Sequence, residues 1–67
     1  MRYILVTSIA LRDAYVWKVI KEGNKLMPVM TYDISKAKTF RSEISACKLV
    51  SAIYWTTFRE YHVSVKI

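Results

Sequence analysis

The sequence predicts an α+β domain with the element order β-β-β-α-β, in which a mainly antiparallel four-stranded sheet carries one helix packed on one face. Two observations predict this class. Four short segments are rich in β-branched and aromatic residues, and turn signals separate the first three of them. One segment between the third and the fourth repeats its apolar residues with the period of a helix. The length of 67 residues suits a single domain, so we assign residues 1–67 to one domain.

The first strand is expected over residues 2–8, where apolar residues occupy both faces. Successive side chains of a strand point to opposite faces of a sheet. The two faces are therefore Tyr3, Leu5 and Thr7 on one side, and Ile4, Val6 and Ser8 on the other. Residues 11–13, which include the charged pair Arg12 and Asp13, are expected to form the turn that follows.

The second and third strands are expected to form a hairpin over residues 14–21 and 26–32. The faces of the second strand are Tyr15, Trp17 and Val19 on one side, and Ala14, Val16 and Ile20 on the other. The sequence EGNK between the strands predicts a primed turn, because Gly and Asn tolerate positive φ. Pro28 cannot donate a ladder hydrogen bond, which places the third strand at an edge or gives it a bulge.

The helix is expected within residues 41–55, after a short turn that Asp33 caps. Phe40 is expected to anchor the chain on the core before the helix starts. Ser42 is a favourable N-cap residue, and an acidic residue follows it at the positive end of the helix dipole. The apolar stripe that covers the sheet consists of Ala46, Leu49, Val50 and Ile53, flanked by Cys47 and Tyr54.

The last strand is expected over residues 61–67, where apolar and polar residues alternate strictly. The side chains expected to face the core are Tyr61, Val63, Val65 and Ile67. We expect the spatial order third, second, first, fourth, which places Pro28 at an edge. A parallel orientation of the fourth strand beside the first is one option, and other positions for it remain open.

A single helix can cover only one face of this sheet, although both faces carry apolar residues. We expect Ile4, Val6, Val16 and Ile20 to lie under the helix. The opposite face would then expose Tyr3, Leu5, Tyr15, Trp17 and Val19, and Trp55 would be exposed on the outer side of the helix. Such a patch exceeds what a monomer usually exposes and indicates a partner-binding surface. Three occupants remain open: a second copy, which would give a homodimer, another protein, or nucleic acid that stacks on the rings.

The net charge of +6 favours anionic partners such as nucleic acid or acidic proteins. It also suits a small apolar protein that needs charge to stay dispersed. One group of basic residues lies around the expected start of the helix, where backbone N–H groups add positive potential. These candidate phosphate contacts are Lys36, Lys38, Arg41 and Lys48. A solvated charged loop is the alternative interpretation.

The sequence predicts no enzyme, because the residues that chemistry requires are isolated. His62 is the only histidine and Cys47 the only cysteine, expected as an inert buried thiol. One His and one Cys do not make a zinc site, and a single Gly cannot form a phosphate-binding loop. We expect no catalytic residue, metal, cofactor or small-molecule substrate. No apolar run approaches the ~20 residues of a membrane span, and a lone cysteine fits the cytoplasm.

The segment of residues 33–46, DISKAKTFRSEISA, resembles a pattern in small phage- and prophage-encoded open reading frames. In these, D-x-x-K-A-x-x-F-x-S-x-x-x-A follows a hairpin and precedes a helix and a last strand. The matching residues are Asp33, Lys36, Ala37, Phe40, Ser42 and Ala46. The resemblance implies a viral accessory protein without shared catalytic residues, and several such proteins bind and block host enzymes, including defence nucleases.

These observations together predict a non-enzymatic binding module in the host cytoplasm. We expect a homodimer that binds and inhibits or modulates a host protein or nucleoprotein. The alternative is a nucleic-acid-binding protein that uses its basic residues and exposed aromatic rings.

Overall fold

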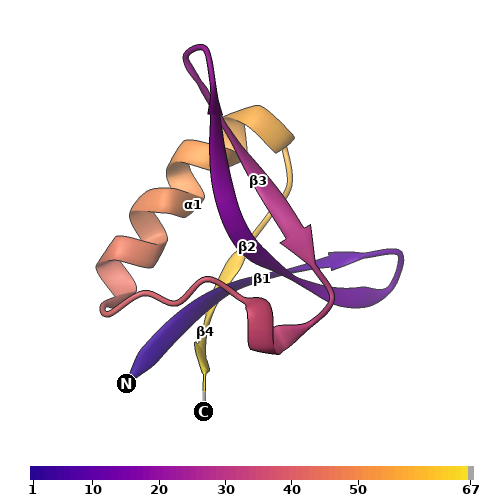
Figure 1. Cartoon of the computed structure of the whole chain (residues 1–67), viewed down its shortest axis with the longest axis vertical. Helices are drawn as coiled ribbons and strands as arrows, with labels where there is room; N and C mark the ends of the chain where they lie inside the picture. The colour runs from indigo at the N-terminus through magenta and orange to yellow at the C-terminus, as the bar shows by residue number, and fades with distance from the viewer. Residues whose placement is uncertain (67) are drawn as a thin grey trace.

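Four antiparallel strands form one sheet, and a helix packs on one of its faces, in the computed structural model, which describes residues 1–66 (Figure 1). The strands are β1 (Arg2–Ile9), β2 (Arg12–Glu22), β3 (Lys25–Thr31) and β4 (His62–Lys66). The helical segments are the short 3-10 turn η1 (Ile34–Lys36) and α1 (Glu43–Thr57). The order β3-β2-β1-β4 confirms the predicted fold class and strand order, with Pro28 on an edge strand.

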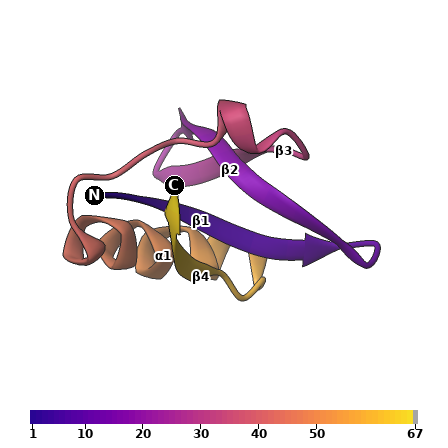
Figure 2. The ribbon, with the colours of Figure 1, turned by 90° about the horizontal axis from the view of Figure 1, so that it is seen from below.

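β4 runs antiparallel to β1, so the parallel orientation that we considered is wrong. The register pairs Val6 with His62 and Arg2 with Lys66. The path of the chain before α1 explains this direction. It returns across the sheet to Tyr3, so α1 runs in the direction of β1 and ends where an antiparallel β4 begins (Figure 2). Ile67, which we expected to face the core, lies outside the described residues.

The turn between β1 and β2 consists of Ala10 and Leu11 rather than of residues 11–13. Ile9 pairs with Arg12, and the φ angles of the two turn residues are 52° and 65°. Such a primed two-residue turn matches the twist of the flanking strands, but positive φ is strained for residues that carry a Cβ atom. Leu11 is 100% exposed, so no packing within the described residues offsets this strain.

Replacing Ala10 by Asn and Leu11 by Gly together should stabilise the protein by about 1 kcal/mol, because Asn-Gly adopts a primed turn without strain. Urea unfolding followed by circular dichroism measures the change. Gly23→Ala is the matched control in the other hairpin, where φ is +60° and the same argument predicts a loss of stability. An unchanged or lower stability of the Asn-Gly variant would contradict the strained turn.

A β-bulge in β2 changes which of its side chains face α1. The pairing with β3 shifts register between Val16 and Lys18, which leaves Trp17 as an additional residue. Because the alternation of faces restarts after the bulge, Val16 and Val19 both pack against the core beneath α1. The simple alternation that we assumed for this strand is therefore wrong.

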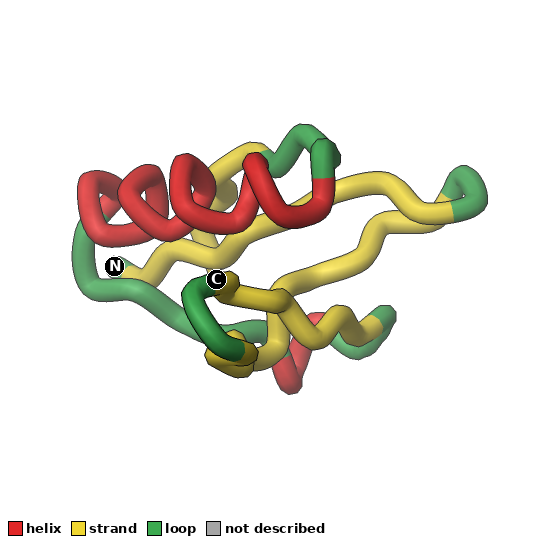
Figure 3. Tube along the Cα trace, turned by 90° about the horizontal axis from the view of Figure 1, so that it is seen from above, coloured by secondary structure: helices red, strands yellow, loops and turns green. Residues whose placement is uncertain are grey.

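Residues 37–40 fill the space that opens where β1 and β2 diverge from their shared hairpin (Figure 3). The Lys38 N–H donates to the Val16 carbonyl at 2.8 Å. The Phe40 N–H donates to the Tyr3 carbonyl at 2.8 Å, and the Tyr3 N–H donates to the Phe40 carbonyl at 3.0 Å. The connection thus pairs with both strands and confirms that Phe40 anchors the chain on the core.

β1 is buried on both faces by its own chain. On the side of α1, Leu5 is 0% exposed and belongs to a cluster with Val16, Ala46 and Ile53. On the opposite side, Ile4 is 1% exposed and clusters with Val6 and Ala37, with Tyr15 packed against them. Figure 2 shows α1 on one side of β1 and η1 on the other. The residues around η1 therefore act as a second, smaller cover for the sheet.

Our assignment of the two sheet faces is correct for Val16 on the α1 side and for Tyr15 on the opposite side, but wrong for most of the other residues. Tyr3 and Leu5 lie on the α1 side, whereas Ile4 and Val6 lie on the side that Ala37 covers. Ile20, which we placed under the helix, is largely exposed. The error arose because both faces of β1 are apolar, so its composition does not fix its orientation.

α1 begins and packs as predicted. The Ser42 hydroxyl accepts the Ser45 N–H at 3.1 Å, which confirms Ser42 as the N-cap. The predicted stripe is buried or half-buried against the sheet: Ala46, Leu49, Val50 and Ile53. The expectation of a buried thiol is wrong, because Cys47 is exposed. Cys47 lies about 100° around the helix from Ala46, beyond the edge of the stripe.

Asp33 caps η1, as predicted, and its contacts determine its ionisation. The Ser35 hydroxyl and the Ser35 N–H donate to its carboxylate at 2.7 and 3.0 Å. These two hydrogen bonds lower the pKa of Asp33 below its ordinary value of 3.8. A carboxyl group whose pKa is lower in the folded state stabilises the fold at pH values above its pKa in the unfolded state. That contribution is lost as the pH falls through the folded pKa, in a window below pH 3.8.

The Ser35→Ala variant should raise the pKa of Asp33 toward 3.8, because it removes the hydrogen bond with the largest effect. A carbon-detected NMR titration of the side-chain carboxyl measures this directly. Ser45→Ala, at the start of α1, is a control that should leave the Asp33 titration unchanged. An Asp33 pKa at or above 3.8 in the unmodified protein would contradict the capping arrangement.

Candidate binding surface

Trp17 is 43% exposed on the side of the sheet away from α1. The Lys18 ammonium lies 4.7 Å from the centre of a ring of Trp17, and the Lys36 ammonium lies 5.8 Å from it. The Lys38 ammonium lies instead 5.7 Å from the centre of the Phe40 ring, although its backbone bonds to Val16, the residue before Trp17. We call Trp17, Lys18 and Lys36 the Trp17 patch. Two segments that are distant in sequence, β2 and η1, thus build one basic surface around an indole.

The charge of the Trp17 patch is positive. It carries two ammonium groups, and the ionised carboxylate of Asp33, at the start of the same turn as Lys36, offsets part of this charge. Cations also lie over rings elsewhere: the Arg12 guanidinium is 4.2 Å from the centre of the Tyr32 ring. Each such contact contributes roughly 0.5–1 kcal/mol at an exposed site. The protein's own cations therefore already occupy positions over these rings.

Only part of the predicted partner-binding set lies at the surface. Leu5 is fully buried beneath α1, so its predicted contact with a partner is wrong. Tyr3 and Val19 are half-buried against the same core, and Tyr15 is half-buried against the cluster around Ile4. The remaining two predicted residues, Trp17 and Trp55, are exposed, but they lie on opposite sides of the molecule.

The predicted phosphate-contact residues do not form one cluster. Lys36 belongs to the Trp17 patch, whereas the Lys38 ammonium lies over the Phe40 ring. Lys48 lies instead on the outer side of α1, where it lines a shallow depression. Arg41 is exposed in the segment between these two sites. These residues are close to the helix start in sequence but are separated in space. The reason is that residues 37–40 cross the edge of β1 before α1 begins.

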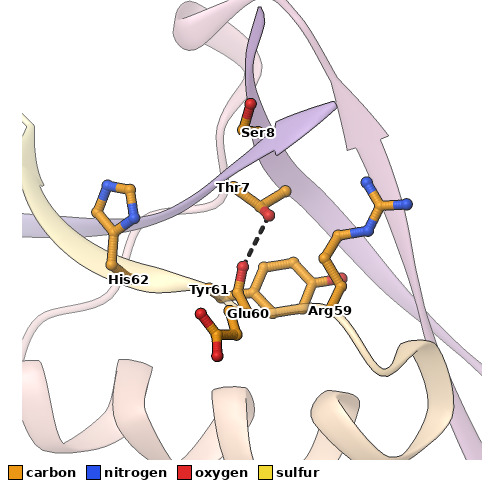
Figure 4. A pocket seen from close by; sticks show the side chains of 6 residues that line it. All are labelled: Thr7, Ser8, Arg59, Glu60, Tyr61 and His62. Atoms are coloured by element: carbon orange, nitrogen blue, oxygen red, sulfur yellow. Dashed lines mark hydrogen bonds between the residues drawn. The ribbon is translucent and has the colours of Figure 1, made fainter. Parts of the chain in front are cut away.

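An open, polar pocket of about 520 Å³ lies at the end of β1 and the start of β4 (Figure 4). Its lining residues are Thr7, Ser8, Arg59, Glu60, Tyr61 and His62. The Thr7 hydroxyl donates to the Glu60 carbonyl at 2.7 Å, which joins the connection after α1 to β1. Figure 4 shows His62 and Arg59 on opposite sides of this bond. Within residues 1–66, no three His, Cys, Asp or Glu side chains gather in a way that could hold a metal ion.

A second exposed surface, which the sequence only partly indicated, lies on the outer side of α1. The Tyr54 ring meets the Trp55 ring edge-on at 5.4 Å and the Phe58 ring at 6.4 Å. Phe58 ends the helix with a φ of 52°, and its N–H donates to the Tyr54 carbonyl at 2.6 Å. Glycine usually occupies this left-handed position. The aromatic residue after the helix was the available signal, and we did not use it.

Comparison of the chain with models of protein families, with curated proteins and with solved structures gave no match. No helix within residues 1–66 combines the length and the apolar character needed to cross a bilayer.

Proposed function

We propose that the protein is a non-enzymatic binding module that docks an acidic protein surface on the Trp17 patch. The observation that carries this proposal is an indole, 43% exposed, with two lysine ammonium groups within 5.8 Å of it. Tryptophan is enriched among the residues that dominate protein interfaces. The surrounding lysines complement a negative partner and speed its association. The net charge of +6 adds long-range attraction of the same sign.

Two observations favour an acidic protein over nucleic acid. Base stacking requires an accessible ring face, and cations of this chain lie over the rings of both Trp17 and Tyr32. The predicted phosphate contacts are also split, since Lys48 lies away from Lys36 and Lys38. Nucleic acid remains the alternative occupant of the same patch, and the experiment below separates the two.

The resemblance of residues 33–46 to phage-encoded reading frames supports a partner in the host cytoplasm. In this proposal the protein inhibits or modulates a host protein, such as a defence nuclease, by occupying part of its surface. No chemical step of its own is required, because occupation alone excludes the natural ligand of that surface.

Binding of two probes of equal negative charge tests the proposal: a glutamate–leucine peptide and a single-stranded oligothymidylate. We expect the peptide to bind more tightly, because its leucines can contact the indole. The Trp17→Ser variant should weaken peptide binding by about 10-fold or more, since an anchor tryptophan is worth at least ~1.4 kcal/mol. Trp55→Ser is the matched control on the opposite side and should leave the affinity per site unchanged.

Other outcomes of this experiment decide against the acidic-protein proposal. Tighter binding of the oligonucleotide, with a steep loss of affinity as salt rises and with sensitivity to Trp17→Ser, would favour the nucleic-acid alternative. Equal responses to Trp17→Ser and Trp55→Ser would show that the patch is not the binding surface. Binding of neither probe at low salt would contradict a basic docking site altogether.

A further inference from the structure

We infer that the outer side of α1 binds a second copy of the chain, with the two helices antiparallel and related by a two-fold axis at Ser51. This surface lies on the opposite side of the molecule from the Trp17 patch, so the inference does not depend on the proposed function. Figure 2 shows α1 as an outer layer of the molecule. We call its exposed stripe the outer helix stripe: Ile44, Cys47, Lys48, Ser51, Tyr54, Trp55 and Phe58.

The outer helix stripe is apolar and large. Ile44 is 70% exposed, Trp55 is 73% exposed and Phe58 is 75% exposed. At about 100° per residue these side chains lie opposite Ala46 and Ile53, which face the sheet. Large exposed apolar residues at both ends of one helix face exceed the scattered single residues that are normal on a surface.

The stripe offers both a projection and a depression for it. Trp55 and Phe58 project from the C-terminal half of α1. The N-terminal half carries an apolar depression of about 400 Å³, lined by Glu43, Ile44, Cys47, Lys48 and Ser51. An antiparallel second copy places the projecting rings of each helix at the depression of the other. This is the isologous arrangement that a two-fold axis requires.

The stripe is also self-complementary about Ser51. Lys48 and Tyr54 lie three residues to either side, which places an ammonium against the ring of the second copy. Ser51 itself is small, so the two backbones can approach closely at the axis. This complementarity identifies a second copy, rather than another protein, as the occupant.

The backbone at the end of α1 supports the same conclusion. Phe58 adopts a φ of 52°, a conformation that is strained for a bulky residue and free for glycine. Within the described residues its ring contacts Tyr54 while remaining 75% exposed, so burial in its own chain does not offset the strain. Contact with Ile44 of the second copy would do so.

Light scattering and sedimentation equilibrium of the whole chain test the inference first. A helix of 15 residues offers less than a standard interface, so we expect a dimer Kd on the order of 10 µM. The measured mass should rise from 7.9 kDa to twice that value across this range. The Trp55→Ser variant should weaken association by about 30-fold, as expected for an interface anchor. A mass of 7.9 kDa at all concentrations up to about 100-fold above that Kd would overturn the inference.

Two further variants test the geometry itself. In a Cys47→Ser background, Ser51→Cys should form a disulfide-linked dimer under mild oxidation, because its Cβ atoms meet at the axis. Ala52→Cys in the same background is the matched control, about 100° around the helix, and should not. The inference would be overturned if Trp55→Ser left the dimer affinity unchanged and the cysteines at positions 51 and 52 crosslinked equally. Such a result would mean that another face of the molecule associates.

Discussion

The Leu5→Ala variant should lose about 2–5 kcal/mol of stability, the range for truncating a fully buried leucine. Leu5 is 0% exposed and lies at the centre of the cluster between β1 and α1. A chain of this length has a total stability of only about 3–10 kcal/mol. We therefore expect a large unfolded fraction at room temperature. In circular dichroism this fraction would appear as a thermal unfolding transition of reduced amplitude and cooperativity.

Leu11→Ala is the matched control for this prediction. It makes the same substitution at a leucine that is 100% exposed, where a change within about 0.5 kcal/mol is expected. If Leu5→Ala were no more destabilising than Leu11→Ala, Leu5 would lie at an open surface, as our sequence-based assignment of the faces required. The structure predicts the opposite.

The Ile4→Ala variant should cost about 2–3 kcal/mol, although no part of α1 covers this residue. Its cover is Ala37 in the connection before α1, together with Val6 and Tyr15. The estimate lies at the lower end of the range for buried isoleucine, because this cluster is the smaller of the two. Chemical unfolding by urea measures the difference in free energy.

Ile34→Ala provides the control for Ile4→Ala, since Ile34 is largely exposed in η1. We expect a cost well below 1 kcal/mol for it. Similar small costs for both variants would mean that the connection does not bury the second face of β1. Together with Leu5→Ala, this pair of measurements reports on each face of the central strand separately.

The sequence allowed the prediction of elements whose pattern is local. β4 alternates apolar and polar residues, the stripe of α1 has the period of a helix, and Ser42 and Asp33 are residues with clear capping roles. The order of the strands followed from short hairpins and an edge strand that contains Pro28. These features depend on neighbours in the sequence, so composition and spacing were sufficient to predict them.

The orientation of β1 and β2 depended on contacts that are distant in sequence. Tyr3 pairs with Phe40, and Ala37 covers Ile4, so a segment that we treated only as a turn and an anchor covers the second face. The bulge at Trp17 reverses the alternation of β2, and no turn residue marks it. An apolar strand with two similar faces therefore could not be oriented from its own residues.

The same long-range contacts determine which surfaces remain for partners. Because the chain covers both faces of β1, residues 1–66 do not leave the broad open face that we expected over this strand. Two smaller surfaces on opposite sides take its place. The Trp17 patch is basic, and the outer helix stripe is largely apolar. In our proposals the Trp17 patch binds an acidic partner and the outer helix stripe binds a second copy of the chain. A dimer would therefore present two Trp17 patches.

Amide hydrogen exchange at Lys38 and Phe40 tests most directly whether the connection closes the second face of β1. Their N–H groups donate to the Val16 and Tyr3 carbonyls, both at 2.8 Å, so these amides should exchange about 100-fold or more slowly than free amides. The exposed hairpin tip at Gly23 provides the fast-exchanging reference. Exchange at Lys38 and Phe40 as fast as at Gly23 would show an uncovered sheet and contradict the account of the two buried faces of β1.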